Sequence, residues 1–169
     1  TDRAAFAKRN NLIIVTDETY DFLTYDGGKH FSPASIPAVR DRVILCGSFS
    51  KKYAMTGYRV GFAFADEGII DHMLKVHDAL QICAPAISQK AAIAALKGSQ
   101  KSVRDFLKKF TENRELMCRE LDKMKEFFEY QKPMGSYFIM VKVKKPKMNS
   151  FGLTLKILRE ARVITIPGA

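Results

Sequence analysis

Three short polar segments of this chain carry side chains that could do chemistry together. Asp17-Glu18-Thr19-Tyr20 follows the apolar run 12–16, Ser48-Phe49-Ser50-Lys51 follows the apolar run 43–47, and Arg59 comes eight positions after Lys51. They offer a carboxylate, a phenol, hydroxyls, an amine and a guanidinium, which are groups used in proton transfer, nucleophilic attack and anion binding. Taken singly, each has an ordinary explanation, because the chain has many lysines and an Asp-Glu pair can simply cap a helix. Only their combination points to a site.

The elements around these segments predict an α/β arrangement that brings them together. Residues 12–16, 43–47 and 60–65 are short apolar runs typical of adjacent buried strands, and residues 2–9 have the pattern of a helix. Residues 20–40 are rich in turn formers, and their prolines argue against regular helix, so we expect a long loop there. Since α/β proteins place ligands at the ends of strands, the segments after the first two runs should open onto one site.

The later half of the chain is mainly helical in pattern. Asp66 can cap a helix, a second helix should run from about Pro85 to Gly98, and apolar residues from Val103 to Phe128 predict one long amphipathic helix. We then expect a strand over 136–143, a helix from Asn149 or Ser150 through Arg159, and a strand starting at 163–166.

The three polar segments closely resemble the signature of class I/II aminotransferases in the aspartate aminotransferase superfamily, which are fold type I pyridoxal-phosphate enzymes. The shared pattern is Asp-x-x-Tyr, then Ser-x-Ser-Lys, then an Arg eight positions after the Lys, and three separated segments agree in order and spacing. The likeness extends over the rest of the chain, through 81–85 and 135–138 to the final 166–169. It implies an α/β fold whose large domain has a mostly parallel sheet with helices and is followed by a partial α+β small domain. The expected division is 1–115 for the later part of the large domain and 116–169 for part of the small domain.

The resemblance also implies a role for each site residue. Lys51 would carry pyridoxal 5'-phosphate as a Schiff base and, once substrate displaces it, would move the proton as general acid and base. Asp17 would keep the pyridine nitrogen protonated, and Tyr20 would donate to the phenolic oxygen of the cofactor. Arg59 and Ser48 would bind the phosphate. Ser50 is a further candidate, Lys52 is expected to be a surface neighbour, and no metal is expected.

The implied activity is transfer of an amino group between an amino acid and a 2-oxo acid. Three alternatives stay open: a pyridoxal-phosphate C-S lyase or eliminase of the same fold, a cofactor-binding effector domain of a transcription regulator, and a non-catalytic homologue. The resemblance further implies a homodimer, with residues near 82–88 approaching the partner's cofactor. The segment 55–59 favours the aminotransferase subgroup that acts on aspartate, alanine or aromatic substrates.

Composition excludes several other classes. The net charge is +10, but its lysines are interspersed with apolar residues at helical or strand spacing, which is typical of a solvated face, so no nucleic-acid partner is expected. Three scattered cysteines favour a reducing compartment, and no apolar run is long enough for a membrane span, so we expect a cytoplasmic protein. His72 and His77 are five apart, which suits one metal ion poorly, and Gly57 with Gly61 forms no dinucleotide fingerprint.

The chain starts at Thr1 without an initiator Met and reads like the inside of a helix, so we expect a fragment. In the resembling family, segments outside the matched region supply phosphate-cradling groups, an aromatic residue stacked on the ring, an Asn near the phenolic oxygen and an Arg for the substrate carboxylate. The 169 residues alone are therefore expected to bind the cofactor weakly and to be inactive.

Overall fold

The computed structural model describes residues 2–145 and 148–168. The chain forms two compact units, one made of Thr1–Arg114 with Pro133–Tyr137 and the other of Glu115–Lys132 with Phe138–Ala169. Within the described residues, no helix combines the length and the apolar character that crossing a membrane requires.

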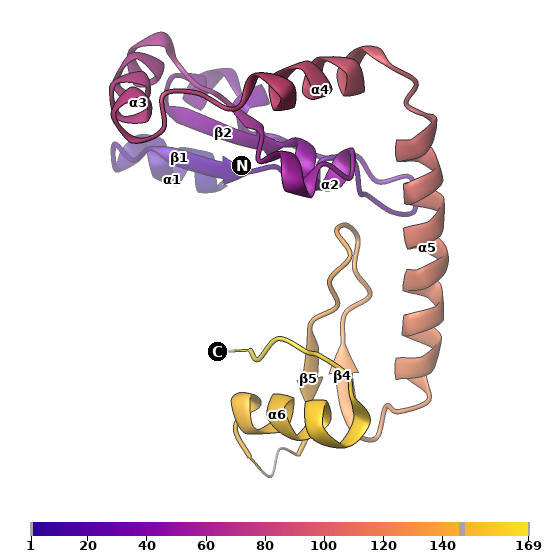
Figure 1. Ribbon diagram of the computed structural model, residues 1–169. Helices are drawn as coiled ribbons and strands as arrows, with labels where there is room; N and C mark the ends of the chain where they lie inside the picture. The colour runs from indigo at the N-terminus through magenta and orange to yellow at the C-terminus, as the bar shows by residue number, and fades with distance from the viewer. Residues whose placement is uncertain (1, 146–147, 169) are drawn as a thin grey trace. The chain divides into compact units, whose positions relative to one another are not determined.

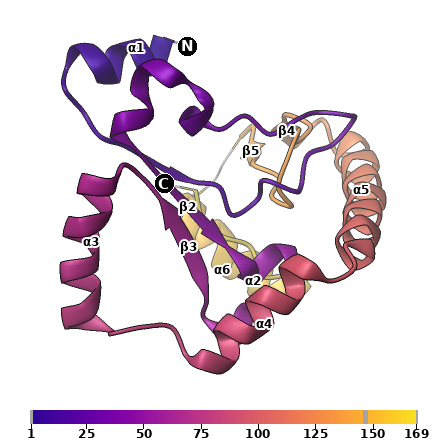
Figure 2. The same cartoon turned by 90° about the horizontal axis from the view of Figure 1, so that it is seen from above.

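The first unit is built on a three-stranded sheet in the order β1 (Ile14–Asp17), β2 (Val43–Ser48), β3 (Gly61–Phe64). Figure 1 labels β1 and β2. β2 pairs in parallel with β1 and antiparallel with β3, which lies beside it in Figure 2. The three expected strands are confirmed, and the sheet they form is mixed. Because β3 runs in the reverse direction, its start lies at the same edge as the ends of β1 and β2.

The segment between β1 and β2 is not wholly a loop. It contains two 3-10 helices, η1 (Pro33–Ser35) and η2 (Pro37–Arg42), each with proline at its start, where a missing N–H and a fixed φ suit a helix. Val39 and Val43 are almost fully buried against Ala4 of the N-terminal helix α1 (Asp2–Arg9) and form one small core. This core fixes the start of β2.

A short helix leaves the end of β2 and returns the chain to the sheet. It is α2 (Phe49–Lys52), and it is followed by the 3-10 turn η3 (Thr56–Tyr58) before β3. Phe49, Met55 and Val60 bury their side chains with Ala92 of a later helix in a second core. The loop from β2 to β3 is therefore a packed structure.

Helices α3 (Glu67–Leu80) and α4 (Ala86–Lys97) follow at the expected places. The side chain of Asp66 accepts a hydrogen bond from Gly68 N–H at the start of α3, and Gly98 ends α4.

The expectation that all three strands are buried is wrong. Along β1 and β3 the burial alternates or is slight, and Val15 and Phe64 keep 68% and 65% of their surface exposed. Strand side chains point alternately to the two faces, and parts of both faces are left uncovered by the described residues.

The second unit contains the later part of the long helix α5 (Lys101–Asp122), a two-stranded antiparallel sheet of β4 (Phe128–Tyr130) and β5 (Val141–Val143), and α6 (Ser150–Ala161). The long helix was expected to reach Phe128, but that residue starts β4 and pairs with Val143. The strand expected over 136–143 is shorter, since 138–140 are irregular, and no strand forms over 163–166. Ile164 and Ile166 are about four-fifths exposed, and no ladder hydrogen bonds are described for this segment.

Gly47 gives a direct test of the packing on β2. A Cβ at this position would overlap the Phe62 ring of the neighbouring strand, which packs edge-on against Phe49. We expect Gly47→Ala to lower the free energy of unfolding by about 1–3 kcal/mol, since the ring must move out of its place. Urea denaturation measures the change.

Gly57→Ala is the matched control, because nothing lies within 4 Å of a Cβ built there. Equal urea midpoints for the two variants would show that the close contact between Gly47 and the Phe62 ring contributes nothing to stability.

Candidate active site

The sheet brings the three polar segments to one edge. Asp17 is the last residue of β1 and pairs with Cys46, so it lies on the same face of the sheet as Ser48, two residues further along β2. Ser48 in turn pairs with Gly61, the first residue of β3, and Arg59 lies two residues before that. Lys51 follows Ser48 by one turn of α2. Four of the predicted residues, Asp17, Ser48, Lys51 and Arg59, therefore lie at one edge of the sheet, where β1 and β2 end and β3 begins.

Asp17 is held as an ionised carboxylate at the end of β1. Its Oδ1 accepts two hydrogen bonds from Thr19, one from the hydroxyl at 2.6 Å and one from the backbone N–H at 3.0 Å. Both hydrogen bonds lower the pKa of Asp17 below its usual value, and the one from the Thr19 hydroxyl has the larger effect. In the described part of the chain no hydrogen bond reaches Oδ2, so that oxygen can accept a proton donor from a ligand.

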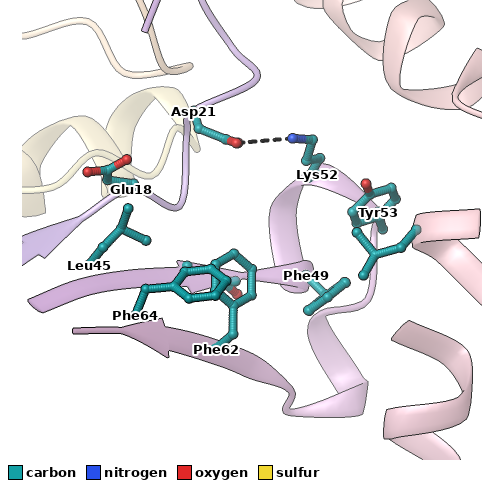
Figure 3. Close-up of a pocket in the computed structure, with 11 residues that line it drawn as sticks. Glu18, Asp21, Leu45, Phe49, Lys52, Tyr53, Phe62 and Phe64 are labelled. Atoms are coloured by element: carbon teal, nitrogen blue, oxygen red, sulfur yellow. Dashed lines mark hydrogen bonds and ion pairs between the residues drawn. The ribbon is translucent and has the colours of Figure 1, made fainter. Parts of the chain in front are cut away.

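Lys51 and Lys52 are neighbours with different partners. The Lys52 amine lies 3.0 Å from a carboxylate oxygen of Asp21 and forms an ion pair with it (Figure 3). The Lys51 side chain is half-buried, and its amine has no hydrogen bond or ion pair with any residue in 2–145 or 148–168. Lys52 was expected to be a surface neighbour; it is instead partly buried and tied to the loop after β1. Of these two lysines, Lys51 is therefore the one whose amine has no partner among the described residues.

The two serines before Lys51 shape the turn that carries it. Ser48 is the N-cap of α2, and its hydroxyl oxygen accepts a hydrogen bond of 3.1 Å from Ser50 N–H. No hydrogen bond from the Ser48 hydroxyl proton to another described residue is present, so this proton could be donated to a ligand. The Ser50 carbonyl accepts from the Thr56 hydroxyl at 3.3 Å, which ties the end of the turn to the loop before Arg59.

Arg59 has a constrained backbone and an open side chain. Its φ of 52° places it in the left-handed region, where the chain turns from η3 into β3. One guanidinium N–H donates to Thr56 O at 3.0 Å, and the other donors have no partner among the described residues. The buried hydroxyl of Ser88 donates to Tyr58 O at 2.7 Å and fixes the preceding residue. Arg59 therefore offers free, permanently charged donors to an anion.

Tyr20 is protonated and hydrogen-bonded. Its hydroxyl donates to the Tyr137 hydroxyl at 3.0 Å, and the two rings meet edge to face with centroids 5.2 Å apart. Burial, followed by the hydrogen bond to Tyr137, raises the pKa of Tyr20 to about 12. Tyr20 can therefore act as a hydrogen-bond donor at any physiological pH.

Two buried charged residues support this edge and were missed by the sequence reasoning. Glu18 is buried, and its carboxylate accepts from the Ser32 hydroxyl at 2.6 Å and pairs with His30 at 2.8 Å. It was read only as part of a helix cap. Arg114 is 5% exposed and pairs with Asp26 through two hydrogen bonds of 2.7 and 2.9 Å. A signal for Arg114 was present, because it lies on the apolar stripe of the long helix.

A hollow of about 270 Å³ lies beside the sheet and adjoins this site at Ser48. Its lining includes Leu45 and Gly47 of β2, Phe62 and Phe64 of β3, and the Lys52–Asp21 pair. Figure 3 shows this pair across from Phe62 and Phe64. Ser48 also lines the hollow, whereas Asp17, Lys51 and Arg59 do not. Asp17, Lys51 and Arg59 gather instead at the end of the sheet where β1 and β2 finish and β3 begins. No group of histidine, cysteine or acidic residues among those described could hold a metal ion.

Comparisons with known proteins identify the family of this chain. The family model of "Aminotransferase class I and II" matches residues 2–169, and the chain belongs to this family. A probable aspartate aminotransferase from Methanocaldococcus jannaschii is 38% identical over 98% of the chain and 43% of its own length. An aromatic-amino-acid aminotransferase 2 from Thermococcus litoralis is 32% identical over the same share of both proteins.

Solved structures show the same fold. An aromatic aminotransferase from Pyrococcus horikoshii OT3 superposes with a TM-score of 0.93 at 33% identity, covering 99% of this chain and 45% of that one. The expected family and the fold class of fold type I pyridoxal-phosphate enzymes are therefore confirmed. The chain spans less than half the length of these relatives.

The raised pKa of Tyr20 predicts how stability depends on alkaline pH. The folded state keeps this proton up to about pH 12, whereas the unfolded chain loses it near pH 10. The stabilisation is therefore complete below pH 10 and is lost as the pH rises from 10 to about 12. We expect Tyr20→Phe to lose stability less steeply than the unmodified protein over this range, as measured by urea midpoints.

Tyr58→Phe removes a hydroxyl from an exposed tyrosine and is the control for general alkaline effects. If Tyr20→Phe and Tyr58→Phe show the same alkaline slope as the unmodified protein, Tyr20 is not the group responsible.

Proposed function

We propose that the full-length protein containing this chain is a pyridoxal-phosphate-dependent aminotransferase that transfers an amino group between an amino acid and a 2-oxo acid. The observation that carries the proposal is the meeting of Asp17, Lys51 and Arg59 at one edge of the sheet, with an unpaired amine, an ionised carboxylate and open guanidinium donors. Each of these groups matches one part of the cofactor.

The donor set fits the cofactor by its chemistry. Arg59 and the hydroxyl proton of Ser48 suit the phosphate, the open Oδ2 of Asp17 suits a protonated ring nitrogen, and Tyr20 suits the phenolic oxygen. When bound, pyridoxal phosphate supplies an aldehyde that reacts with amines and a ring that withdraws electrons from the substrate Cα.

Each site residue of this chain would have a distinct role in the reaction. Lys51 Nζ would hold the cofactor before substrate arrives and would then carry a proton to and from the substrate Cα, because an amine can act as both base and acid. Asp17 would hold the proton on the ring nitrogen, since its own pKa is lowered by Thr19. Arg59 and Ser48 would bind the phosphate through their hydrogen-bond donors and so fix the position of the cofactor.

The wider assignment is part of the same proposal. We propose that residues 1–115 belong to a large domain and 116–169 to a small one, and that the protein is a cytoplasmic homodimer. Ile82 and Ile87 support the dimer, because both are more than 70% exposed in the segment expected at the partner. The three free cysteines agree with a reducing compartment.

Named relatives support amino acids and 2-oxo acids as the substrate class. They include aspartate, aromatic and N-acetyl-LL-diaminopimelate aminotransferases, which differ in the amino donor. A panel of amino donors with 2-oxoglutarate, applied to the full-length protein, identifies the substrate. Release of ammonia without amino transfer would instead indicate an eliminase.

Covalent trapping tests the assignment of Lys51. Borohydride reduction of the full-length protein incubated with pyridoxal phosphate should fix the cofactor on the peptide that contains Lys51, as read by mass spectrometry. Lys51→Arg should abolish trapping and lower kcat by at least about 10²-fold, because an amine acting in proton transfer is lost.

Lys52→Arg is the matched control, since it keeps a cation near Asp21 and leaves Lys51 in place. Trapping should persist in this variant. Trapping on Lys52, or none in a correctly folded protein, would contradict the proposed function.

A further inference from the structure

The segment Pro133–Tyr137 is bound tightly to the loop that follows β1. Tyr25 N–H donates to Met134 O at 3.0 Å, Ser136 N–H donates to Leu23 O at 2.9 Å, and the Tyr25 hydroxyl donates to Ser136 O at 2.7 Å. Leu23 and Tyr25 are themselves buried. Two stretches more than 100 residues apart in the sequence thus form one rigid local structure.

Arg114, on α5, forms hydrogen bonds to both of these stretches. Besides its paired hydrogen bonds to Asp26, it donates to Pro133 O at 2.9 Å, and its guanidinium lies 4.1 Å from the centre of the Tyr25 ring. Because the buried Arg114 guanidinium bonds to both segments, it fixes the distance between the loop after β1 and the Pro133–Tyr137 segment.

The backbone at the end of the segment directs Tyr137 towards Tyr20. Ser136 has a φ of 59°, a conformation that non-glycine residues rarely adopt, and its N–H and carbonyl are both hydrogen-bonded. The next side chain, Tyr137, stacks on Phe110 with ring centroids 5.6 Å apart and reaches the Tyr20 hydroxyl with its own. The strained residue is thus held in place by its hydrogen bonds.

We propose that Tyr137 is a positioning residue for Tyr20. Tyr137 holds the Tyr20 hydroxyl in place, and it frees the Tyr20 proton for a ligand by changing from hydrogen-bond acceptor to hydrogen-bond donor. The inference rests on the proposed function, in which Tyr20 donates to the phenolic oxygen of the cofactor. Each phenol has one proton and can also accept. In this structure the Tyr20 proton points to Tyr137. When Tyr20 turns that proton to a ligand oxygen, Tyr137 donates to Tyr20.

The exchange makes Tyr20 a better donor than a lone phenol would be. A hydroxyl that accepts a hydrogen bond is polarised and donates a stronger one, so a chain from Tyr137 through Tyr20 to the ligand is cooperative. The stacked Phe110 and the edge-to-face contact keep both rings in place while only the O–H bonds turn. Burial keeps Tyr20 protonated, in agreement with its raised pKa.

A spectroscopic titration of the full-length protein with bound pyridoxal phosphate tests this. The pH midpoint of the colour change reports the charge on the phenolic oxygen, because the deprotonated chromophore carries more negative charge there and a donated hydrogen bond favours it. Tyr20→Phe should raise the midpoint by about one unit and Tyr137→Phe by about half a unit. The double variant should match Tyr20→Phe alone, since Tyr137 acts only through Tyr20.

Tyr130→Phe is the control, because it removes a hydroxyl that donates to Cys118 O in the other unit. It should leave the midpoint unchanged. Two outcomes would overturn the proposed role of Tyr137 and leave the proposed function standing. One is a midpoint that shifts in Tyr20→Phe but not in Tyr137→Phe, and the other is a double variant in which the two shifts add fully. A full-length protein that shows no cofactor band would overturn the proposed function as well.

Discussion

Strand β2 is hydrogen-bonded on both sides, and the position of every candidate site residue depends on this. Its parallel pairing with β1 sets Asp17 opposite Cys46, and its antiparallel pairing with β3 sets Ser48 opposite Gly61. A shift of one residue in either ladder would move the side chains of the shifted strand to the other face. The carboxylate at the end of β1, the amine after β2 and the guanidinium before β3 share an edge only in this register.

Buried polar contacts outside the sheet hold the loops in that arrangement. Glu18 fixes the loop that contains His30 and Ser32, and Arg114 fixes Asp26 together with the Pro133–Tyr137 segment. A buried charge left without a partner is costly, so each of these contacts strongly favours one conformation of the loop it holds. The loop after β1 is thus held at several points, and Tyr20 lies within it.

Much of this could be predicted from the sequence, because the signals were local. Apolar runs predicted the three strands, and Asp66 and Gly98 predicted the start of one helix and the end of another. The order and spacing of the segments with Asp17, Lys51 and Arg59 predicted the family. The end of the long helix was wrong, since apolar Phe128 fits a helical stripe as well as a strand, and its pairing with Val143 decides between them.

The contacts that could not be predicted join residues distant in the sequence. Nothing in the spacing of Tyr20 and Tyr137 shows that they meet, because the contact depends on the left-handed turn at Ser136. The direction of β3 was likewise hidden, since an apolar run has the same composition in a parallel and an antiparallel strand.

We propose that the cofactor binds at the sheet edge that carries Asp17, Lys51 and Arg59, and not in the neighbouring hollow. A crystal structure of the full-length protein grown with pyridoxal phosphate tests it most directly. We expect electron density continuous from Lys51 Nζ to the cofactor, the ring nitrogen within hydrogen-bond distance of Asp17 Oδ2, and the phosphate against Arg59 and Ser48. Density for the cofactor in the hollow beside Lys52 and Asp21, with the sheet edge empty, would contradict it.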